Sequence, residues 1–253
     1  MERRASARRF CLYIMMDVAM TKEFQPLDKG VHSDLKIKSG LSFAHLEGQN
    51  VVPLVAQEFG FASANFPVMF VKDPNNGEFR SVGILGVEEG ENLIFTPEKV
   101  NATYIPMDIQ RYPFAVARDD ENQRLVLCVD VKSDLLVEDG ESIISEDGTL
   151  GERAERSQEI MKQYVEQEAV TRELLRVLDE YELIAPAQVR VTFDGESRLL
   201  NGLFRVDDKK VQELSDDKVL ELHRRNYFPA IFAHLQSLAQ LQVLIDLKAA
   251  QQK

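Results

Sequence analysis

Between residues 66 and 136 the sequence reads, in order, FPVMFVKD (66–73), VGILGVEEGENLIF (82–95), YIPMDIQRYPFAV (104–116) and LCVDVKSDLL (127–136). Each stretch contains a short apolar run, and turn residues separate the runs. The clearest turn signal is the Asn76-Gly77 pair, because both residue types tolerate positive φ. The connections are too short for crossover helices, so the pattern predicts a mainly antiparallel sheet built as a meander.

Helical patterns dominate the C-terminal half of the chain. Apolar residues spaced three and four apart predict a long helix over about residues 152–181. Two stretches at 189–193 and 199–206 flank an Asp-Gly pair, which predicts a hairpin. Ser215 can cap a helix that begins with two aspartates, and an apolar stripe over 229–247 predicts a final helix.

These patterns together predict an α+β fold with a mainly antiparallel sheet, made of a meander and a C-terminal hairpin, and three to four helices concentrated in the C-terminal half. The chain has 253 residues, of which 44% are hydrophobic and 28% charged, as in ordinary soluble globular proteins. It shows no internal repeat and no clear linker. We therefore expect one domain over residues 21–250, long enough to bury its core without disulfides.

The first twenty residues stand apart from this pattern. A basic start precedes an apolar run over residues 10–16, which is short for a secretion signal and is followed by Asp17. A second interpretation is that translation starts at Met16 or Met20, and this one is favoured. We expect residues 1–20 to be a disordered or mis-started extension and the protein to be cytoplasmic, with export or cell-surface association as the alternative.

The charge and apolar content of the chain exclude some partners. Its formal net charge is −12, which argues against nucleic acid because phosphate binding needs a local excess of Lys and Arg. No apolar stretch approaches the ~20 residues that span a bilayer, so we expect no membrane span. The two cysteines match no metal or redox spacing.

One triplet resembles a metal-binding motif. His32 and Asp34 have the His-x-Asp spacing of iron oxygenases, and His223 or His234 could complete a site of two histidines and one carboxylate. The third ligand would come from a distant helical stretch, so a histidine beside a turn is the favoured interpretation. We expect no metal and no cofactor; the alternative is iron held by His32, Asp34 and His234.

The most informative segment for binding contains two tyrosines, an arginine and two prolines. Tyr104 precedes Ile105-Pro106, and Arg111 and Tyr112 precede Pro113. Such residues suit a rigid, amphipathic recognition surface, for which Tyr104, Arg111 and Tyr112 are the candidates. The alternative is a proline-braced connection whose Tyr and Arg satisfy backbone carbonyls. The sequence contains no catalytic motif that we could assign.

Short matches in a fixed order resemble the bacterial SapC family. They are His32 with Asp34-Leu35, Val52-Pro53-Leu54, Glu58-Phe59, Phe66-Pro67, Gly90-Glu91-Asn92-Leu93, Tyr104-Ile105-Pro106, Arg111-Tyr112-Pro113-Phe114, residues 202–207 (GLFRVD) and His234-Leu235-x-Ser237-Leu238. The resemblance implies a link to a bacterial surface layer. It also points to nutrient acquisition, because such genes are associated with outer-membrane uptake receptors and iron-dependent hydroxylases.

From these observations we expect a soluble, non-enzymatic binding or accessory protein linked to a surface layer or to outer-membrane nutrient uptake, with an unknown protein partner from that system. An iron- and 2-oxoglutarate-dependent oxygenase using His32 and Asp34 is the alternative from another class. A structural surface-layer component is the second alternative.

Overall fold

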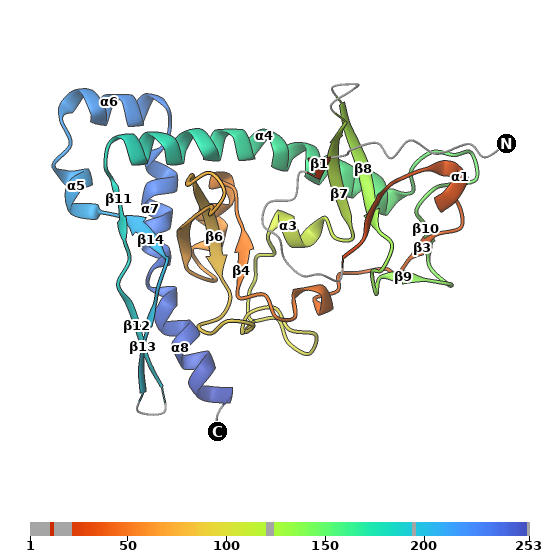
Figure 1. Ribbon diagram of the computed structural model, residues 1–253, viewed down its shortest axis with the longest axis horizontal. Helices are drawn as coiled ribbons and strands as arrows, with labels where there is room; N and C mark the ends of the chain where they lie inside the picture. The colour runs from red at the N-terminus through yellow and green to blue at the C-terminus, as the bar shows by residue number, and fades with distance from the viewer. Residues whose placement is uncertain (1–10, 13–21, 120–123, 194–195, 252–253) are drawn as a thin grey trace. The chain divides into compact units, whose positions relative to one another are not determined.

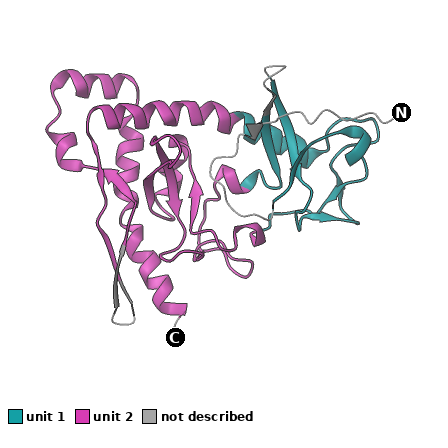
Figure 2. Ribbon diagram, viewed as in Figure 1, with its two compact units in different colours: residues 1–42, 110–162 teal, residues 43–109, 163–253 magenta. Residues whose placement is uncertain are grey.

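The computed structural model describes residues 11–12, 22–119, 124–193 and 196–251. The chain divides into two compact units, coloured separately in Figure 2. Unit 1 comprises Met1–Ser42 and Gln110–Lys162, and unit 2 comprises Phe43–Ile109 and Gln163–Lys253. Most of the predicted extension 1–20 lies outside the described residues. The prediction of a single domain stays a prediction.

Unit 1 holds two small antiparallel sheets (Figure 1). The first has the order β1-β7-β8-β2 and consists of Cys11–Leu12, Phe114–Asp119, Arg124–Asp130 and Phe24–Pro26. The second has the order β10-β3-β9 and consists of Glu141–Ser142, Lys36–Ile37 and Leu136–Val137. The helix α1 (Lys29–His32) and the first turns of α4 (Glu152–Glu180) complete the unit.

Unit 2 contains a five-stranded antiparallel sheet and most of the helices. The sheet has the order β11-β14-β5-β6-β4, with bounds Ile184–Pro186, Phe204–Val206, Val68–Lys72, Phe79–Ile84 and Val51–Pro53. The hairpin β12-β13 comprises Val189–Phe193 and Glu196–Leu200. The short helices are η1 (Ala44–Leu46), η2 (Ala56–Glu58), α2 (Phe59–Ala62), α3 (Met107–Gln110, whose last residue belongs to unit 1) and α5 (Asp208–Gln212). The longer ones are α6 (Asp216–Arg224), α7 (Phe228–Ser237) and α8 (Gln240–Gln251).

The predicted antiparallel pairing and the concentration of helices in the C-terminal half are confirmed. In the first predicted hairpin, β5 pairs with β6 around a turn in which Gly77 has a φ of 73°. On β6, a Cβ atom at Gly83 would lie 2.7 Å from the Phe66 ring, so only glycine lets the strand approach that ring. The second hairpin, β7-β8, belongs to a different sheet. The predicted meander is therefore two separate hairpins.

Two predicted strands differ from the structure for local reasons. The end of the apolar run at 82–95 forms no strand but only an isolated bridge at Phe95, because the Asn92 side chain accepts hydrogen bonds from the backbone N–H groups of Ile94 and Phe95. The return strand expected at 199–206 is split at Gly202, which has a φ of 78°. Consequently β13 pairs with β12, whereas β14 pairs with β11 and β5.

The last predicted helix is also divided. After α7 the backbone N–H groups of Leu238 and Ala239 donate hydrogen bonds to carbonyls three residues earlier, which ends the regular α-helical pattern, and α8 then begins.

The other C-terminal helices also differ in detail from the prediction. Ser215 precedes α6, but its side chain makes no capping hydrogen bond. In α7 the fully buried positions are Ile231, His234 and Ser237, while Leu235 and Leu238 are only partly buried against the core. Five helices, α4 to α8, thus stand where three to four were expected.

Among the described residues, one helical segment, Phe228–Gln251, is long and apolar enough by composition to cross a membrane. Core helices of globular proteins pass the same test, and here Ile231, His234 and Leu244 are buried within unit 2. The absence of a membrane span therefore stays a prediction.

Candidate functional site

Tyr104, the first predicted binding residue, takes part in a buried network of unit 2. Its hydroxyl donates to the Glu58 carboxylate at 2.8 Å, and the backbone N–H groups of Met107 and Val55 donate to the same carboxylate at 2.8 and 2.9 Å. Glu58 is buried, and its burial raises the pKa of the carboxyl group, which the three donors oppose. The Tyr104 ring stacks on Phe61 with centroids 5.4 Å apart. Tyr104 therefore braces a loop of unit 2.

Arg111 and Tyr112 lie in unit 1 and are 8% and 5% exposed. Arg111 donates from Nη1 to the carbonyl of Phe114 at 2.7 Å, and the Tyr112 hydroxyl donates to Asp130 Oδ2 at 3.1 Å. The peptide bond between Tyr112 and Pro113 is cis. This burial favours the second of the two interpretations, in which the segment is an internal brace.

The three residues of the alternative iron site belong to different units. His32 and Asp34 belong to unit 1, where the His32 Nδ1 accepts a hydrogen bond from the Asp28 N–H at 3.0 Å. His234 belongs to unit 2, where its Nε2 accepts from the Val206 N–H at 3.0 Å and its ring stacks on Phe70. Within the part of the chain that the structure describes, no group of three or more His, Cys, Asp or Glu residues could hold a metal ion.

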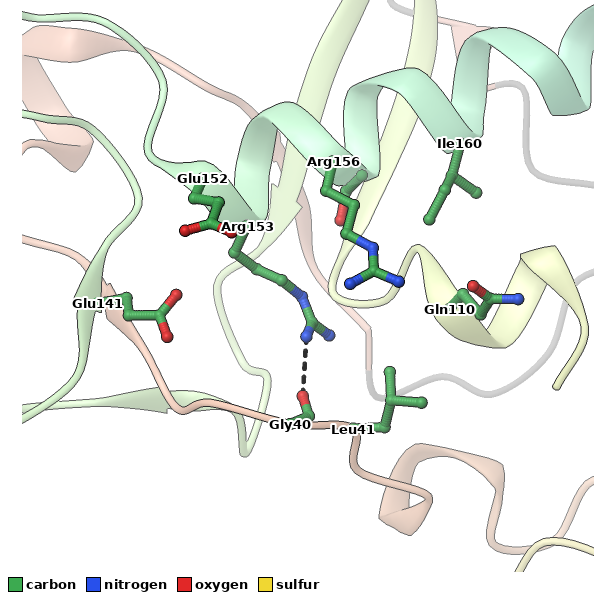
Figure 3. A pocket seen from close by; sticks show the side chains of 9 residues that line it. Gly40, Leu41, Gln110, Glu141, Glu152, Arg153, Arg156 and Ile160 are labelled. Carbon is green, nitrogen blue, oxygen red and sulfur yellow. Dashed lines mark hydrogen bonds between the residues drawn. The ribbon is translucent and has the colours of Figure 1, made fainter.

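A cavity of about 330 Å³ lies within unit 1, beside the first turns of α4 (Figure 3). Its lining comes from one face of that helix and from three distant segments. The residues are Gly40, Leu41, Gln110, Glu141, Glu152, Arg153, Arg156, Ser157 and Ile160. The spacing of the helical residues places them on adjacent turns, because residues three and four apart are neighbours on a helix surface.

Arg153 is the anchored side chain of this cavity. Its Nη1 donates to the carbonyl of Gly40 at 2.9 Å, drawn as a dashed line in Figure 3, and its Nη2 donates to the carbonyl of Tyr112 at 3.3 Å. Partial burial, and then the neighbouring guanidinium of Arg156, lower the pKa of Arg153, while Glu141 raises it. Arg153 nevertheless stays protonated at physiological pH.

Two polar groups of the cavity have no protein partner in the described part of the chain. Arg156 is exposed and makes no hydrogen bond or ion pair there. Ser157 is 1% exposed, and its Oγ is buried without a hydrogen-bond partner. Buried hydroxyl groups normally have a partner, so Ser157 is a second residue of this lining whose hydrogen-bonding capacity is unused among the described residues.

A scan against protein-family models matches the family described as SapC over residues 27–244. The chain belongs to the SapC family. This confirms the resemblance seen in the sequence, and the matched span includes every residue that lines the cavity. No curated protein and no solved structure matches the chain.

A second cavity of this SapC protein, of about 250 Å³, lies within unit 2 along α4. Its two arginines are already neutralised by the protein. Arg172 forms an ion pair with Glu168, and Arg176 forms ion pairs with Glu173 and Glu180. The unit 1 cavity differs because neither of its arginines forms an ion pair with a carboxylate among the described residues, and it is therefore the candidate binding site.

Neither a motif nor the apolar pattern of the sequence reveals this site of the SapC protein. The sequence contains one local indication of the site. Spacings of three and four residues place Arg153, Arg156 and Ile160 on one face of the long helix, so two cations lie beside an aliphatic side chain. The opposing segments around Gly40, Gln110 and Glu141 are brought there by the fold, and no spacing in the sequence reveals them.

Proposed function

We propose that this SapC protein is a non-enzymatic binding or accessory protein that holds a small organic carboxylate in the unit 1 cavity. The observation that carries the proposal is the Arg156 guanidinium, which lies beside Arg153 and lacks a carboxylate partner among the described residues. Two adjacent guanidinium groups repel each other, and an anion between them removes that repulsion.

The donors in the cavity match a carboxylate. A guanidinium presents planar N–H groups that suit two carboxylate oxygens, and charge-assisted bonds of this kind are stronger than neutral ones. The unpartnered Ser157 hydroxyl can donate to the same group. A volume of about 330 Å³ is at the small end of ligand pockets, which favours a ligand of few atoms. Arginine stays protonated, so these groups support recognition of an anion.

Family membership supports the wider setting of the proposal. The resemblance to SapC sequences implies a role at a bacterial surface layer or in outer-membrane nutrient uptake, in which the protein would act from the cytoplasm as an accessory to an unknown protein partner. Affinity capture from the native host, with and without a bound carboxylate, would identify that partner. Cell fractionation would separate this setting from an exported, structural role.

The binding step is tested by calorimetric titration of the full chain with sodium butyrate at constant ionic strength. Arg156→Gln should weaken binding by about tenfold, the size expected for loss of a charge-assisted hydrogen bond. Lys162→Gln is the matched control, because Lys162 is an exposed cation on the same helix that does not line the cavity. The proposal fails if butyrate gives no saturable heat, or if both variants weaken binding equally.

A further inference from the structure

The unit 1 cavity also contains two carboxylates that a simple anion leaves unused. Glu141 and Glu152 are both exposed, and neither forms an ion pair with any residue that the structure describes. The Glu141 Oε1 accepts one hydrogen bond, from the Ser39 hydroxyl at 2.7 Å. The cavity therefore offers negative as well as positive groups to a ligand.

These charges are separated across the cavity. In Figure 3 the carboxylates of Glu141 and Glu152 lie on one side of the Arg153 guanidinium, and the Arg156 guanidinium lies on the other side. Leu41 and Ile160 add aliphatic surface on the side of Arg156. A ligand that satisfies both ends must carry an ammonium group and a carboxylate that are apart from each other.

Resting on the proposed function, we infer that the ligand of this cavity is a small linear zwitterion of the ω-amino-acid class. Its carboxylate contacts Arg156 and Ser157, and its ammonium group lies toward Glu141 and Glu152. The two arginines and the two glutamates balance in charge, so a neutral zwitterion keeps that balance, whereas a simple carboxylate adds a net negative charge. In an α-amino acid a single carbon atom separates the ammonium group from the carboxylate, so it matches this separated arrangement less well than an ω-amino acid does.

The inference is tested by titrating the full chain with butyrate, n-butylamine, glycine and 4-aminobutyrate under one set of buffer conditions. 4-Aminobutyrate should bind about fivefold tighter than butyrate, since an exposed ion pair contributes at most ~1 kcal/mol. Glycine should bind more weakly than 4-aminobutyrate, and n-butylamine should bind most weakly, because it lacks the carboxylate.

Glu152→Gln should remove most of the preference for 4-aminobutyrate over butyrate, because the ammonium group loses one of its two carboxylate partners. Glu155→Gln is the matched control, because Glu155 is also an exposed carboxylate in the first turn of α4 but does not line the cavity. Should butyrate and 4-aminobutyrate bind equally, or glycine bind as well as 4-aminobutyrate, the inference is overturned and carboxylate binding stands. If none of the four compounds binds, the proposed function fails as well.

Discussion

The guanidinium of Arg153 donates a 2.9 Å hydrogen bond to the carbonyl of Gly40, which joins the first turn of α4 to the segment that follows β3. Gly40 has a φ of 89°, a conformation that other residues rarely adopt. The same arginine reaches the carbonyl of Tyr112. One side chain thus ties together three segments of unit 1, all of which adjoin the cavity.

Arg153→Gln should therefore lower the free energy of unfolding by about 1–2 kcal/mol, because two carbonyls lose a charged donor. Arg156→Gln provides the comparison, since Arg156 has no partner among the described residues and its loss relieves repulsion. Its effect should stay within ~0.5 kcal/mol. Urea unfolding measures both. Equal destabilisation by the two substitutions would contradict the anchoring role of Arg153.

Glu58→Gln should destabilise the protein by about 1–3 kcal/mol, because the amide group would turn a donor toward at least one of three N–H or O–H donors. Glu47→Gln, at an exposed carboxylate, should have little effect. The pKa of Glu58 is raised in the folded state, so the folded protein binds the proton more tightly and stability falls as pH rises above the unfolded value of 4.5. Urea unfolding at a series of acidic pH values measures this contribution of Glu58 to the pH dependence of stability, which should be absent from the Glu58→Gln variant. If the pH dependence is the same in both proteins, the raised pKa of Glu58 is contradicted.

His234 should make stability depend on pH in the opposite direction. Burial lowers its pKa from 6.5 to about 4, so the unfolded chain binds a proton that the folded chain excludes. Stability should therefore fall as pH drops from 6.5 toward 4, by at most ~3 kcal/mol. His234→Phe leaves the Val206 N–H unpaired and should be less stable at pH 7, but it should lack this slope. Urea unfolding midpoints between pH 4 and 6.5 test this prediction. If the His234→Phe variant keeps the same pH dependence, His234 is not its source.

In α7, Ile231 should matter more than Leu235. Ile231 is 1% exposed, so Ile231→Ala should cost about 2–5 kcal/mol. Leu235 packs at the edge of the core and is partly exposed, so Leu235→Ala should cost less than half as much. Chemical unfolding of the two variants ranks them, and the reverse order would mean that the helix face is misplaced.

Periodicity in the sequence predicted much of this fold. The antiparallel strand pairs β5-β6 and β7-β8 and the long helix α4 follow from local patterns of apolar residues and turns. The helix α4 matches its expected range of about 152–181 to within one residue. The elements that were predicted incorrectly depend on single residues or on contacts between distant parts of the chain. The Asn92 side chain accepts a hydrogen bond from the backbone N–H group of Ile94, so no strand forms there. The positive φ of Gly202 divides the strand that was predicted over residues 199–206. Neither residue alters the spacing of apolar residues, so the apolar pattern does not reveal these two interruptions.

The candidate site was harder to predict than the fold. Arg111 and Tyr112 have the composition of a recognition surface, yet the fold buries both, because their partners Phe114 and Asp130 belong to the β7-β8 hairpin. The cavity arises from segments that are far apart in the chain, and the separation between Gly40 and Arg153 is 113 residues. Its unpartnered groups, Arg156 and Ser157, have no distinctive sequence context.

The most direct test of carboxylate binding is an NMR titration of the arginine side-chain N–H resonances with butyrate. The resonances of Arg153 and Arg156, assigned through Arg153→Gln and Arg156→Gln, should shift and saturate together at a single dissociation constant. Those of Arg172 and Arg176 in the second cavity should stay in place, because their charges are already paired. Saturable shifts confined to Arg153 and Arg156 are the predicted result. Shifts that grow linearly without saturating, or that appear equally on all four arginines, would contradict binding in the unit 1 cavity.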